Sequence, residues 1–502
     1  MAAGPGFVVE MVNLEGRVWR TGGARPQQVS TFTLASFFNA GDDTLTDPRI
    51  LFDAASGRWF ASLSDEDTNS VFVAVSSSAD PTARWSVTSF AAGGCADQPR
   101  LGVADGVVVV GADIFRSCDE RFSPVLGSEL WVINKAELVA GAATIDRTDF
   151  GPSKDYSSFA PVQSLSPTST EYVVSVDNPR SSAVHLLTVT GIPPGPVQIT
   201  EVATPAIRRL VSPPSAPQPA PSIGGRRISL ATNDDRILDS VWENGKLWFS
   251  GNAGCLPPGD SQLRACARVV ELSTANGTVD WDTDLSRKGG GVFYPALRPD
   301  AAGDLVVVYG ESSATLAPRV TAVARMPDGT FTPSVVVAQS DGPHAGDRYG
   351  DYFGAARDPV DPSVVWVVGE TATDGRTGTG WGTVVGSVVV TPAGGTPPAS
   401  VLLPPPAVLA RPATGKAGTT VLLQYLALAA GTGVRQHVTV SSGKRVVFTR
   451  TTAARTMQMG KVYSVPWRTA KTLRGVFRYC VRSLAADGTQ SGQSCANVTL
   501  RR

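Results

Sequence analysis

The chain lacks two features that would indicate helices. No run of 18 apolar residues occurs, which argues against a transmembrane helix. Long stretches with a 3.6-residue apolar period are also missing, which argues against a helical bundle. Short strands joined by turns are the remaining way for a chain of 502 residues to bury its apolar side chains.

Several catalytic motifs are missing as well. No Gly-x-x-x-x-Gly-Lys loop, His-Glu-x-x-His or Gly-x-Ser-x-Gly sequence occurs, so the signatures of P-loop NTPases, zinc metalloproteases and α/β-hydrolases are absent. There are only three histidines and no Cys-x-x-Cys pair, so an ordinary zinc site is not expected. We therefore predict no cofactor and no metal other than structural calcium, for which the acidic loops 65–67 and 341–347 are the candidates.

What the chain does have is glycine and proline, 51 and 37 residues, between short apolar runs. One phrase recurs, in which an Asp or aromatic residue near a proline precedes a strand. Thr46–Asp53 and Ala96–Gly102 are its clearest copies, and looser ones begin near residues 159, 238, 293 and 349. Strand-rich units repeated every ~40 to 80 residues are typical of propeller blades.

We therefore predict an all-β protein. Residues 1–391 form a β-propeller, with seven blades favoured and six as the alternative, and residues 1–38 supply a blade whose innermost strand is short. A Pro/Gly-rich linker covers 392–407, and 408–502 form a small immunoglobulin-like β-sandwich. The Pro-rich segment 212–221 is expected to be extended and exposed.

The net charge of zero hides a division between these parts. Of 44 basic residues, 15 lie from Pro404 onward and 29 before it, whereas of 44 acidic residues only Asp487 lies there and 43 precede it. The two parts thus carry about −14 and +14 charges, which indicates different partners. The basic part could bind an anionic cell-envelope polymer or an acidic polysaccharide, or it could dock on the acidic propeller.

The six cysteines form three close pairs, Cys95 with Cys118, Cys255 with Cys266, and Cys480 with Cys495. Local pairing in even number predicts three disulfides and an oxidising compartment, so we expect an extracellular or cell-surface protein. Residues 1–6 lack the charged and apolar regions of a signal peptide, so we expect that the true N-terminus has been trimmed or misassigned.

Residues 47–59, 97–102 and 348–362 resemble secreted bacterial β-propeller proteins of the sialidase-like group. The resemblance covers roughly residues 1–390 and implies a propeller fold. The Ser-x-Asp-x-Gly-x-x-Trp boxes of sialidases have no clean copy, and residues 53–59 and 273–278 only approach one. Residues 465–496 resemble immunoglobulin-like modules of bacterial exoproteins, in which a disulfide commonly joins the last strands, as Cys480 and Cys495 would here.

The recurring phrase also predicts the site, because the inner strands of a propeller meet at its axis. Candidate acids, bases and nucleophiles are Asp47, Asp97, Tyr294 and Asp351, and candidate ligand-binding residues are Arg49, Arg100, Asp239, Arg348 and Tyr352. Arginines there could clamp a carboxylate, and paired carboxylates, with Tyr294 as nucleophile in the sialidase manner, could cleave a glycoside. The same Asp and Arg side chains could instead only hold blades together.

We therefore expect a monomeric extracellular protein that binds a glycan at the propeller axis and an anionic surface through its basic module. A glycoside hydrolase or lyase, and a structural scaffold without a small ligand, are the alternatives. Nucleic acid is not expected as a partner, although Trp467, Phe477 and Tyr479 could stack on bases.

Overall fold

The computed structural model describes residues 1–22, 26–41, 43–118, 123–176, 181–219, 222–223, 226–372, 380–390, 400–402, 408–427, 431–458, 461–484 and 493–501. This part of the chain is all-β, as predicted, apart from the short helices α1 (Leu34–Phe38) and α2 (Lys135–Ala140). Neither helix is long or apolar enough to cross a membrane, and the described residues contain no other candidate. Contacts divide the chain into one compact unit of Met1–Gly22 and Gln28–Val401 and a second of Gly23–Gln27 and Leu402–Arg502. The predicted boundaries at 391 and 407 stay predictions.

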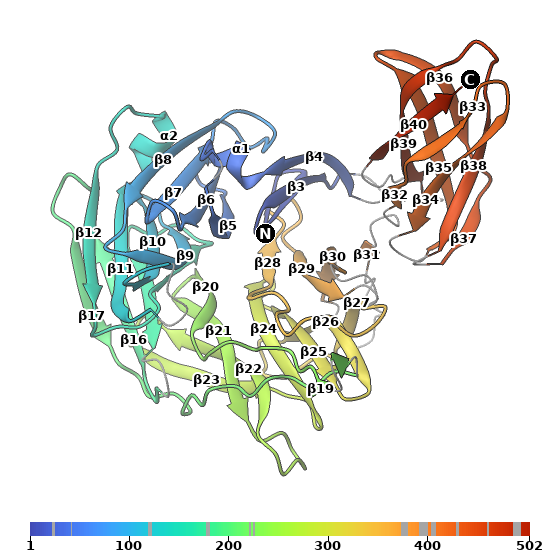
Figure 1. The fold of residues 1–502 in the computed structure, drawn as a ribbon. Coiled ribbons are helices and arrows are strands. Elements are labelled where there is room, and N and C mark those ends of the chain that lie inside the picture. The colour runs from blue at the N-terminus through green and yellow to red at the C-terminus, as the bar shows by residue number, and fades with distance from the viewer. Residues whose placement is uncertain are drawn as a thin grey trace. The chain divides into compact units, whose positions relative to one another are not determined.

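Successive groups of four antiparallel strands make up most of the first unit, and they follow one another around a ring (Figure 1). The first three are β1 (Ala2–Gly4), β2 (Phe7–Val12), β3 (Glu15–Arg20) and β4 (Gln27–Thr33); β5 (Leu45–Asp53), β6 (Arg58–Asp65), β7 (Ser70–Ser76) and β8 (Trp85–Ala91); and β9 (Cys95–Val103), β10 (Val107–Phe115), β11 (Val125–Asn134) and β12 (Arg147–Ser153). The innermost strand of the first sheet is thus short, with three residues.

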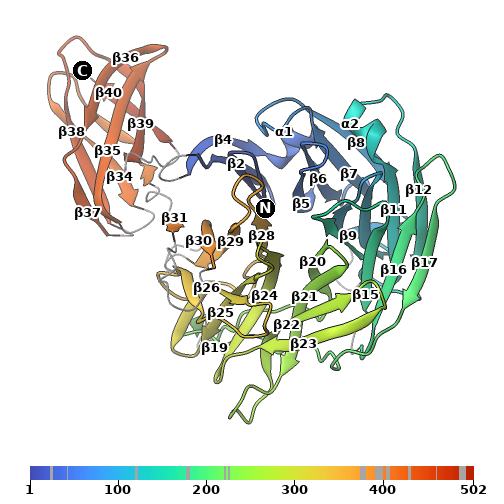
Figure 2. The ribbon, with the colours of Figure 1, turned by 180° about the vertical axis from the view of Figure 1, so that it is seen from behind.

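The ring continues with four further groups of four antiparallel strands, which Figure 2 shows from behind. They are β13 (Ala160–Pro161), β15 (Glu171–Val176), β16 (Val184–Thr190) and β17 (Gln198–Ala203); β20 (Ile237–Glu243), β21 (Lys246–Cys255), β22 (Arg264–Ser273) and β23 (Thr278–Leu285); β24 (Gly290–Pro299), β25 (Leu305–Ser313), β26 (Leu316–Arg325) and β27 (Val335–Gln339); and β28 (Gly354–Arg357), β29 (Val364–Ala372), β30 (Trp381–Val389) and β31 (Ser400–Leu402). Strand β14 (Gln163–Ser164) pairs in parallel with β9 and β20, and so joins β9–β12 and β20–β23 into one nine-stranded sheet. Strand β18 (Ser222–Ile223) pairs with β19 (Arg226–Arg227).

Alternate side chains of a single strand stabilise the stacking of neighbouring sheets. In β10, Val108 and Val110 pack in one core with the β5–β8 sheet, whereas Val107 and Val109 pack in another with Val173 of β15. Successive strand residues point to opposite faces, so a strand between two sheets must be apolar on both. The four consecutive valines 107–110 are therefore explained by the packing of β10 against apolar cores on both of its faces.

The recurring phrase of the sequence corresponds to a bulge in the first strand of several sheets. Asp47, Gln98 and Tyr294, each followed by proline, adopt a left-handed backbone with φ of 54°, 52° and 54°. At each place the register with the next strand shifts, so that two residues oppose one. Such bulges bend a strand and redirect its side chains. The residues that follow, among them Arg49 and Arg100, are therefore oriented by the bulge.

The carbonyl of the bulge proline connects one sheet to its neighbour. Ser62 of β6 donates its hydroxyl to Pro99 O at 2.8 Å, and Ser250 of β21 donates to Pro295 O at 3.0 Å. All these groups are buried between sheets, where an unpaired carbonyl would be costly. The bulge leaves the proline carbonyl without a partner in its own sheet. A serine in the middle of a second strand of the neighbouring sheet thus donates a hydrogen bond to it.

The Pro-rich segment is only partly exposed: Ser212 and Ser215 are exposed, as predicted, and residues 220 and 221 lie outside the described part of the chain. Ala216 and Gln218 are buried, and Ala216 exchanges backbone hydrogen bonds with Leu230. Gln218 Nε2 donates to His344 O at 3.1 Å and His344 N donates to Gln218 Oε1 at 2.7 Å. These hydrogen bonds join the Pro-rich segment to Leu230 and to the segment that contains His344.

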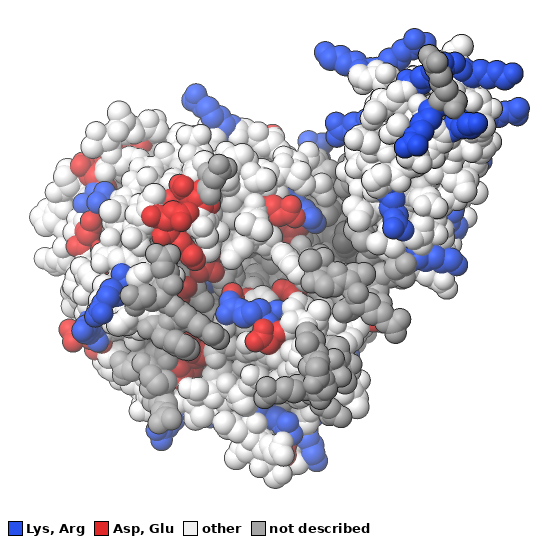
Figure 3. Space-filling model, viewed as in Figure 1, with Lys and Arg blue, Asp and Glu red and all other residues white. Residues whose placement is uncertain are grey.

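The second unit contains two sheets around one apolar core. One sheet contains β32 (Val408–Ala410), β34 (Thr420–Ala427) and β38 (Val462–Arg468). The other contains β33 (Ala413–Lys416), β40 (Ser494–Arg501), β39 (Gly475–Leu484), β35 (Gly431–Ser442) and β36 (Arg445–Thr451), with β37 (Arg455–Met457) paired to β35. Figure 3 shows Lys and Arg side chains gathered at the upper end of this unit and scattered over the rest of the face in view.

The three predicted disulfides are confirmed. Cys95 is bonded to Cys118, Cys255 to Cys266, and Cys480 to Cys495, which leaves no free cysteine. Each bond closes a short loop within one unit, with sequence separations of 23, 11 and 15. Disulfides of this kind are consistent with an oxidising compartment.

Candidate functional site

A cavity of about 570 Å³ lies in the first unit. The first strands of several sheets and the segment from His344 to Ala355 line it. Seven of the nine predicted site residues are in its lining: Asp47, Arg49, Arg100, Asp239, Arg348, Asp351 and Tyr352. Asp97 and Tyr294 are not in its lining. The volume falls within the ~300–1,000 Å³ of small-molecule pockets.

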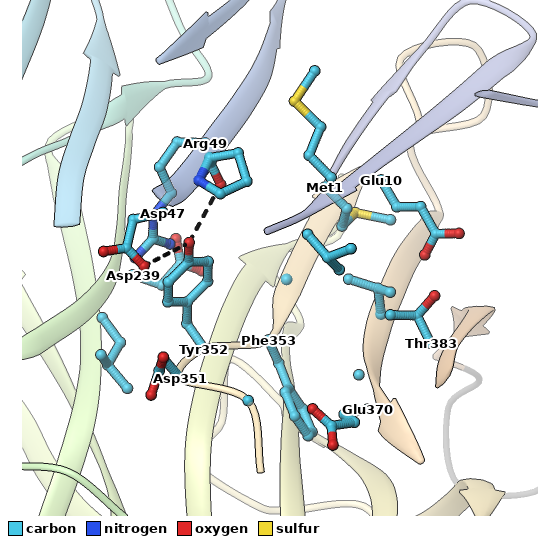
Figure 4. A pocket seen from close by; sticks show the side chains of 18 of the residues that line it. Met1, Glu10, Asp47, Arg49, Asp239, Asp351, Tyr352, Phe353, Glu370 and Thr383 are labelled. Atoms are coloured by element: carbon cyan, nitrogen blue, oxygen red, sulfur yellow. Dashed lines mark hydrogen bonds between the residues drawn. The ribbon is translucent and has the colours of Figure 1, made fainter. Parts of the chain in front are cut away.

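Asp47, Arg49 and Tyr352 form one group in the cavity wall, as Figure 4 shows. The Tyr352 hydroxyl lies 3.3 Å from Asp47 Oδ1, to which it donates. The Arg49 guanidinium carbon lies 3.7 Å from the centroid of the Tyr352 ring, which is cation–π geometry. Burial, followed by the charge of Asp47, raises the pKa of Tyr352 well above its usual range, so this hydroxyl stays a donor.

Asp47 is an unusual acid for two physical reasons. Burial raises its pKa from 3.8 to about 7, and the nearby carboxylates Asp97 and Asp351 act in the same direction. The positive charge of Arg49 and a hydrogen bond from Gln98 N, 3.2 Å from Oδ2, oppose this shift only in part. Asp47 can therefore exchange a proton near neutral pH.

Arg49 differs from the other arginines of the cavity because no described carboxylate is paired with it. Its Nε and Nη2 are buried, and neither donates a hydrogen bond to a described residue. Buried guanidinium donors without an acceptor are costly and uncommon. An acceptor bound in the cavity beside Arg49 would satisfy them once the side chains that cover these two nitrogens shift.

Asp351 and Arg348 are paired with each other on one side of the cavity. Arg348 Nη2 donates to Asp351 Oδ1 and Oδ2 at 2.8 and 2.7 Å, and Asn233 Nδ2 donates to Oδ1 at 2.7 Å. The Arg348 side chain is two-thirds exposed, at 67%, so it can leave Asp351 at little cost.

Glu370 and His344 complete this side of the cavity, and the sequence did not predict either residue. Burial, with the charge of Asp351, raises the pKa of Glu370 to about 8. His344 Nε2 lies 3.7 Å from Glu370 Oε1. No motif marks Glu370, because it is an inner residue of β29, a second strand, whereas the predicted residues came from the recurring phrase.

Asp239 and Arg100 both bind other parts of the protein, although Arg100 Nη1 is buried without a hydrogen bond and lies 3.6 Å from Asp113 Oδ2. Arg298 Nη1 and Leu297 N donate to Asp239 Oδ2 at 2.8 and 2.9 Å, which joins β20 to β24. Arg100 is buried and donates to Ile237 O at 2.9 Å and to Gln98 Oε1 at 2.7 Å. These contacts hold sheets together, which is the structural role that the sequence left open for such residues.

The two predicted residues outside the lining also have partners in the protein. Asp97 accepts from Arg236 Nη1 at 2.5 Å, and the same nitrogen lies 3.1 Å from Asp113 Oδ2. Tyr294 is fully buried and donates its hydroxyl to Ala231 O at 2.8 Å. Burial raises the pKa of Tyr294, so this phenol is held protonated. The geometry gives Tyr294 no access to the cavity as a nucleophile.

A metal centre does not emerge from the described residues, among which no group of three or more His, Cys, Asp or Glu side chains could hold an ion. In the acidic loop 65–67, Asp65 accepts from Asp67 N, Thr68 N and Thr68 Oγ1. This carboxylate therefore caps a turn.

Comparisons with known proteins give no family for this chain. No protein-family profile matches it, and no curated protein matches it. Similar solved structures include a protein of unknown function from Dyadobacter fermentans, with 12% identity over 68% of this chain and 94% of that chain and a TM-score of 0.37. Others are the Synechocystis apocarotenoid oxygenase, with 10% identity, 66% and 69% coverage and a TM-score of 0.37, and the Bombyx mori GH32 β-fructofuranosidase BmSUC1, with 7% identity, 80% and 85% coverage and a TM-score of 0.31. Likeness at this level carries no argument about activity.

Proposed function

We propose that the first unit binds a carboxylate-bearing glycan in its cavity. The observation that carries this proposal is Arg49, whose Nε and Nη2 are buried in the cavity wall without an acceptor. A guanidinium presents parallel donors that match the two oxygens of a carboxylate. Tyr352 fixes the plane of this guanidinium, so its donors are oriented before the ligand arrives.

The remaining lining favours a hydroxyl-rich ligand with one negative charge. Asp47 and Glu370 have pKa values raised to about 7 and 8, so each can donate or accept a hydrogen bond near neutral pH. Sugar hydroxyls need both kinds of partner. A multiply charged anion such as a phosphate would meet Asp351 and these acids at close range and be repelled.

A matched pair of probes tests the proposal. D-glucuronate and D-glucose differ in one carboxylate, and calorimetric titration measures both affinities. We expect glucuronate to bind, and Arg49→Gln to weaken it by about tenfold or more, because a charge-assisted pair is lost. Arg84→Gln, which removes an exposed arginine outside the cavity lining, serves as the control. N-acetylneuraminate serves as a second carboxylate-bearing sugar. The proposal would be contradicted if neither glucuronate nor N-acetylneuraminate bound, or if Arg49→Gln and Arg84→Gln lowered glucuronate affinity equally.

Glycoside hydrolysis is a second candidate, supported by the raised pKa of Asp47. A carboxylic acid that is protonated near pH 7 can donate a proton to a leaving-group oxygen. The test is release of the aryl group from aryl glucuronides, with Asp47→Asn expected to abolish turnover but to retain glucuronate binding. Absence of turnover with bound ligand would leave binding as the function of the cavity.

We also propose that the ring is a seven-bladed β-propeller and that the second unit is an immunoglobulin-like sandwich. The succession of seven groups of four antiparallel strands supports the first, and two sheets around a core with Trp467 support the second. The disulfides support a location outside the cell. Membership of the sialidase-like group stays a prediction from the sequence.

A further inference from the structure

The second unit carries positive charge that its own residues do not neutralise. From Pro404 onward the chain has 15 Lys and Arg and one acidic residue, Asp487, which lies outside the described residues. The basic side chains of this unit's described part therefore have no carboxylate side chain of the same unit to pair with. Such a charge excess destabilises a compact domain by self-repulsion, so it calls for an anionic partner.

The register of the larger sheet places several of these charges on one face. In β39, Phe477, Tyr479 and Val481 point into the core, so Arg478 and Arg482 point outward. The pair His437↔Arg482 and the pair Arg435↔Leu484 continue this face on β35. Lys416↔Arg501 continues it at the other end, on β33 and β40.

These positions form a long cationic stripe, made of Arg435, Arg478, Arg482, Arg501 and Lys416. By register, Arg435 lies opposite residue 484 of β39, and Arg501 lies one residue beyond the pair Gly475↔Leu500. Ten residues of strand correspond to about 33 Å. The stripe is thus longer than a single small anion needs, and it fits an extended polymer.

Hydroxyl and amide groups lie between the charges on the same face. Thr439 pairs with Cys480 and with Thr449, and Asn497 pairs with Arg478. Arg482 Nε makes no hydrogen bond to a described residue, although His437 beside it bonds Thr451 through Nδ1 at 3.0 Å. The disulfide between Cys480 and Cys495 fixes the middle of the face.

The aromatic residues of this unit argue against nucleic acid. Trp467, Phe477 and Tyr479, which the sequence offered as stacking platforms, are 2%, 4% and 0% exposed and belong to the core. Binding of single-stranded nucleic acid without sequence preference relies on exposed aromatic faces as well as on charge. Interleaved hydroxyl groups suit the hydroxyls and ring oxygens of sugars instead.

From this face we infer that the larger sheet of the second unit binds an extended anionic polysaccharide along the cationic stripe. The anionic groups would pair with the stripe arginines, and sugar hydroxyls would bond to the threonines and Asn497 between them. The inference does not depend on the cavity of the first unit, because it uses residues of the second unit alone.

The experiment measures binding of the full chain to polygalacturonate, with dextran as the uncharged probe and single-stranded DNA as the competing class. We expect binding to polygalacturonate and not to dextran, with affinity falling by about tenfold or more between about 50 and about 500 mM NaCl. Arg478→Gln with Arg482→Gln should weaken it by about fivefold or more.

The matched control removes the same charge from elsewhere in the unit. Arg468→Gln on β38 with Arg411→Gln after β32 should change affinity by less than about twofold, and thermal unfolding checks that both pairs fold. If the first pair does not fold, Arg435→Gln with Arg501→Gln on the same face replaces it. Equal loss in stripe and control variants, tighter binding of single-stranded DNA, or no binding of polygalacturonate at low salt would overturn the inference.

Discussion

Tyr352 places its ring against the Arg49 guanidinium and its hydroxyl 3.3 Å from Asp47 Oδ1. The two partners precede Tyr352 by some three hundred residues and belong to β5, whereas Tyr352 lies two residues before the start of β28. Strand β1 contacts both β5 and β28, so the first sheet lies between the two. Closure of the ring thus creates the group that carries the proposed function.

Two substitutions at Tyr352 separate its ring from its hydroxyl. Tyr352→Phe keeps the ring over Arg49 and should cost about 1 kcal/mol, the value of one hydrogen bond. Tyr352→Leu also removes the cation–π contact and should cost about 2 kcal/mol more. Urea unfolding measures both. Equal costs would mean that the stacking on Arg49 contributes nothing to stability.

The raised pKa of Asp47 predicts a definite dependence of stability on pH. The folded protein binds this proton more tightly than the unfolded chain, with a pKa of about 7 against 3.8. Its contribution to stability is therefore complete below about pH 4 and is lost as pH rises through 7. In Asp47→Asn this site cannot ionise, so the free energy of unfolding of the variant relative to the parent should rise by about 2 kcal/mol from pH 5 to pH 8.

Urea unfolding at the two pH values gives this difference directly. Asp105→Asn is the control, because Asp105 is exposed and its side chain makes no hydrogen bond to a described residue. A difference for Asp47→Asn that equals the difference for Asp105→Asn would contradict the raised pKa.

The sequence predicted those parts of the site that lie on first strands or in the segment just before β28. Asp47 and Arg49 stand in a phrase that repeats because each bulge requires similar chemistry at the same place, so repetition revealed them. The same repetition also selected Tyr294, whose backbone matches that of Asp47 but whose hydroxyl bonds to Ala231 O inside the protein. A shared backbone conformation does not fix where a side chain of different length ends.

Other cavity residues could not be predicted because tertiary contacts alone bring them there. Glu370 lies on a second strand, and His344 is positioned by hydrogen bonds with Gln218 of the Pro-rich segment. Composition marked that segment as an exposed loop, because its local chemistry carries no trace of the partners that bury it. The separation of acidic and basic residues between the two parts of the chain, in contrast, could be read from the sequence, because it requires only a count of charged residues.

The serine-to-proline contacts predict the cost of separating neighbouring sheets. Ser62→Ala and Ser250→Ala should each cost about 1 to 2 kcal/mol, because each leaves a buried proline carbonyl without a donor. The sites lie on different sheets, so the double variant should cost the sum to within about 0.5 kcal/mol. Ser89→Ala, at an exposed position of β8, is the control. Thermal and urea unfolding that did not distinguish Ser62→Ala from Ser89→Ala would contradict this role.

Asp239 tests whether a cavity residue can be structural rather than ligand-binding. Its Oδ2 accepts from Arg298 Nη1 and Leu297 N, and the two side chains are only 15% and 10% exposed. Asp239→Asn leaves a buried arginine without its carboxylate and should cost about 2 to 3 kcal/mol. Arg298→Gln should cost a similar amount, and the double variant should cost less than the sum by about 1 kcal/mol or more, because the pair acts as a unit.

Glucuronate affinity, measured where the variants remain folded, should change by less than about threefold, in contrast to Arg49→Gln. A loss of glucuronate affinity without a loss of stability would contradict this structural role. It would assign Asp239 to ligand binding, because a side chain that only joins β20 to β24 does not contact the ligand.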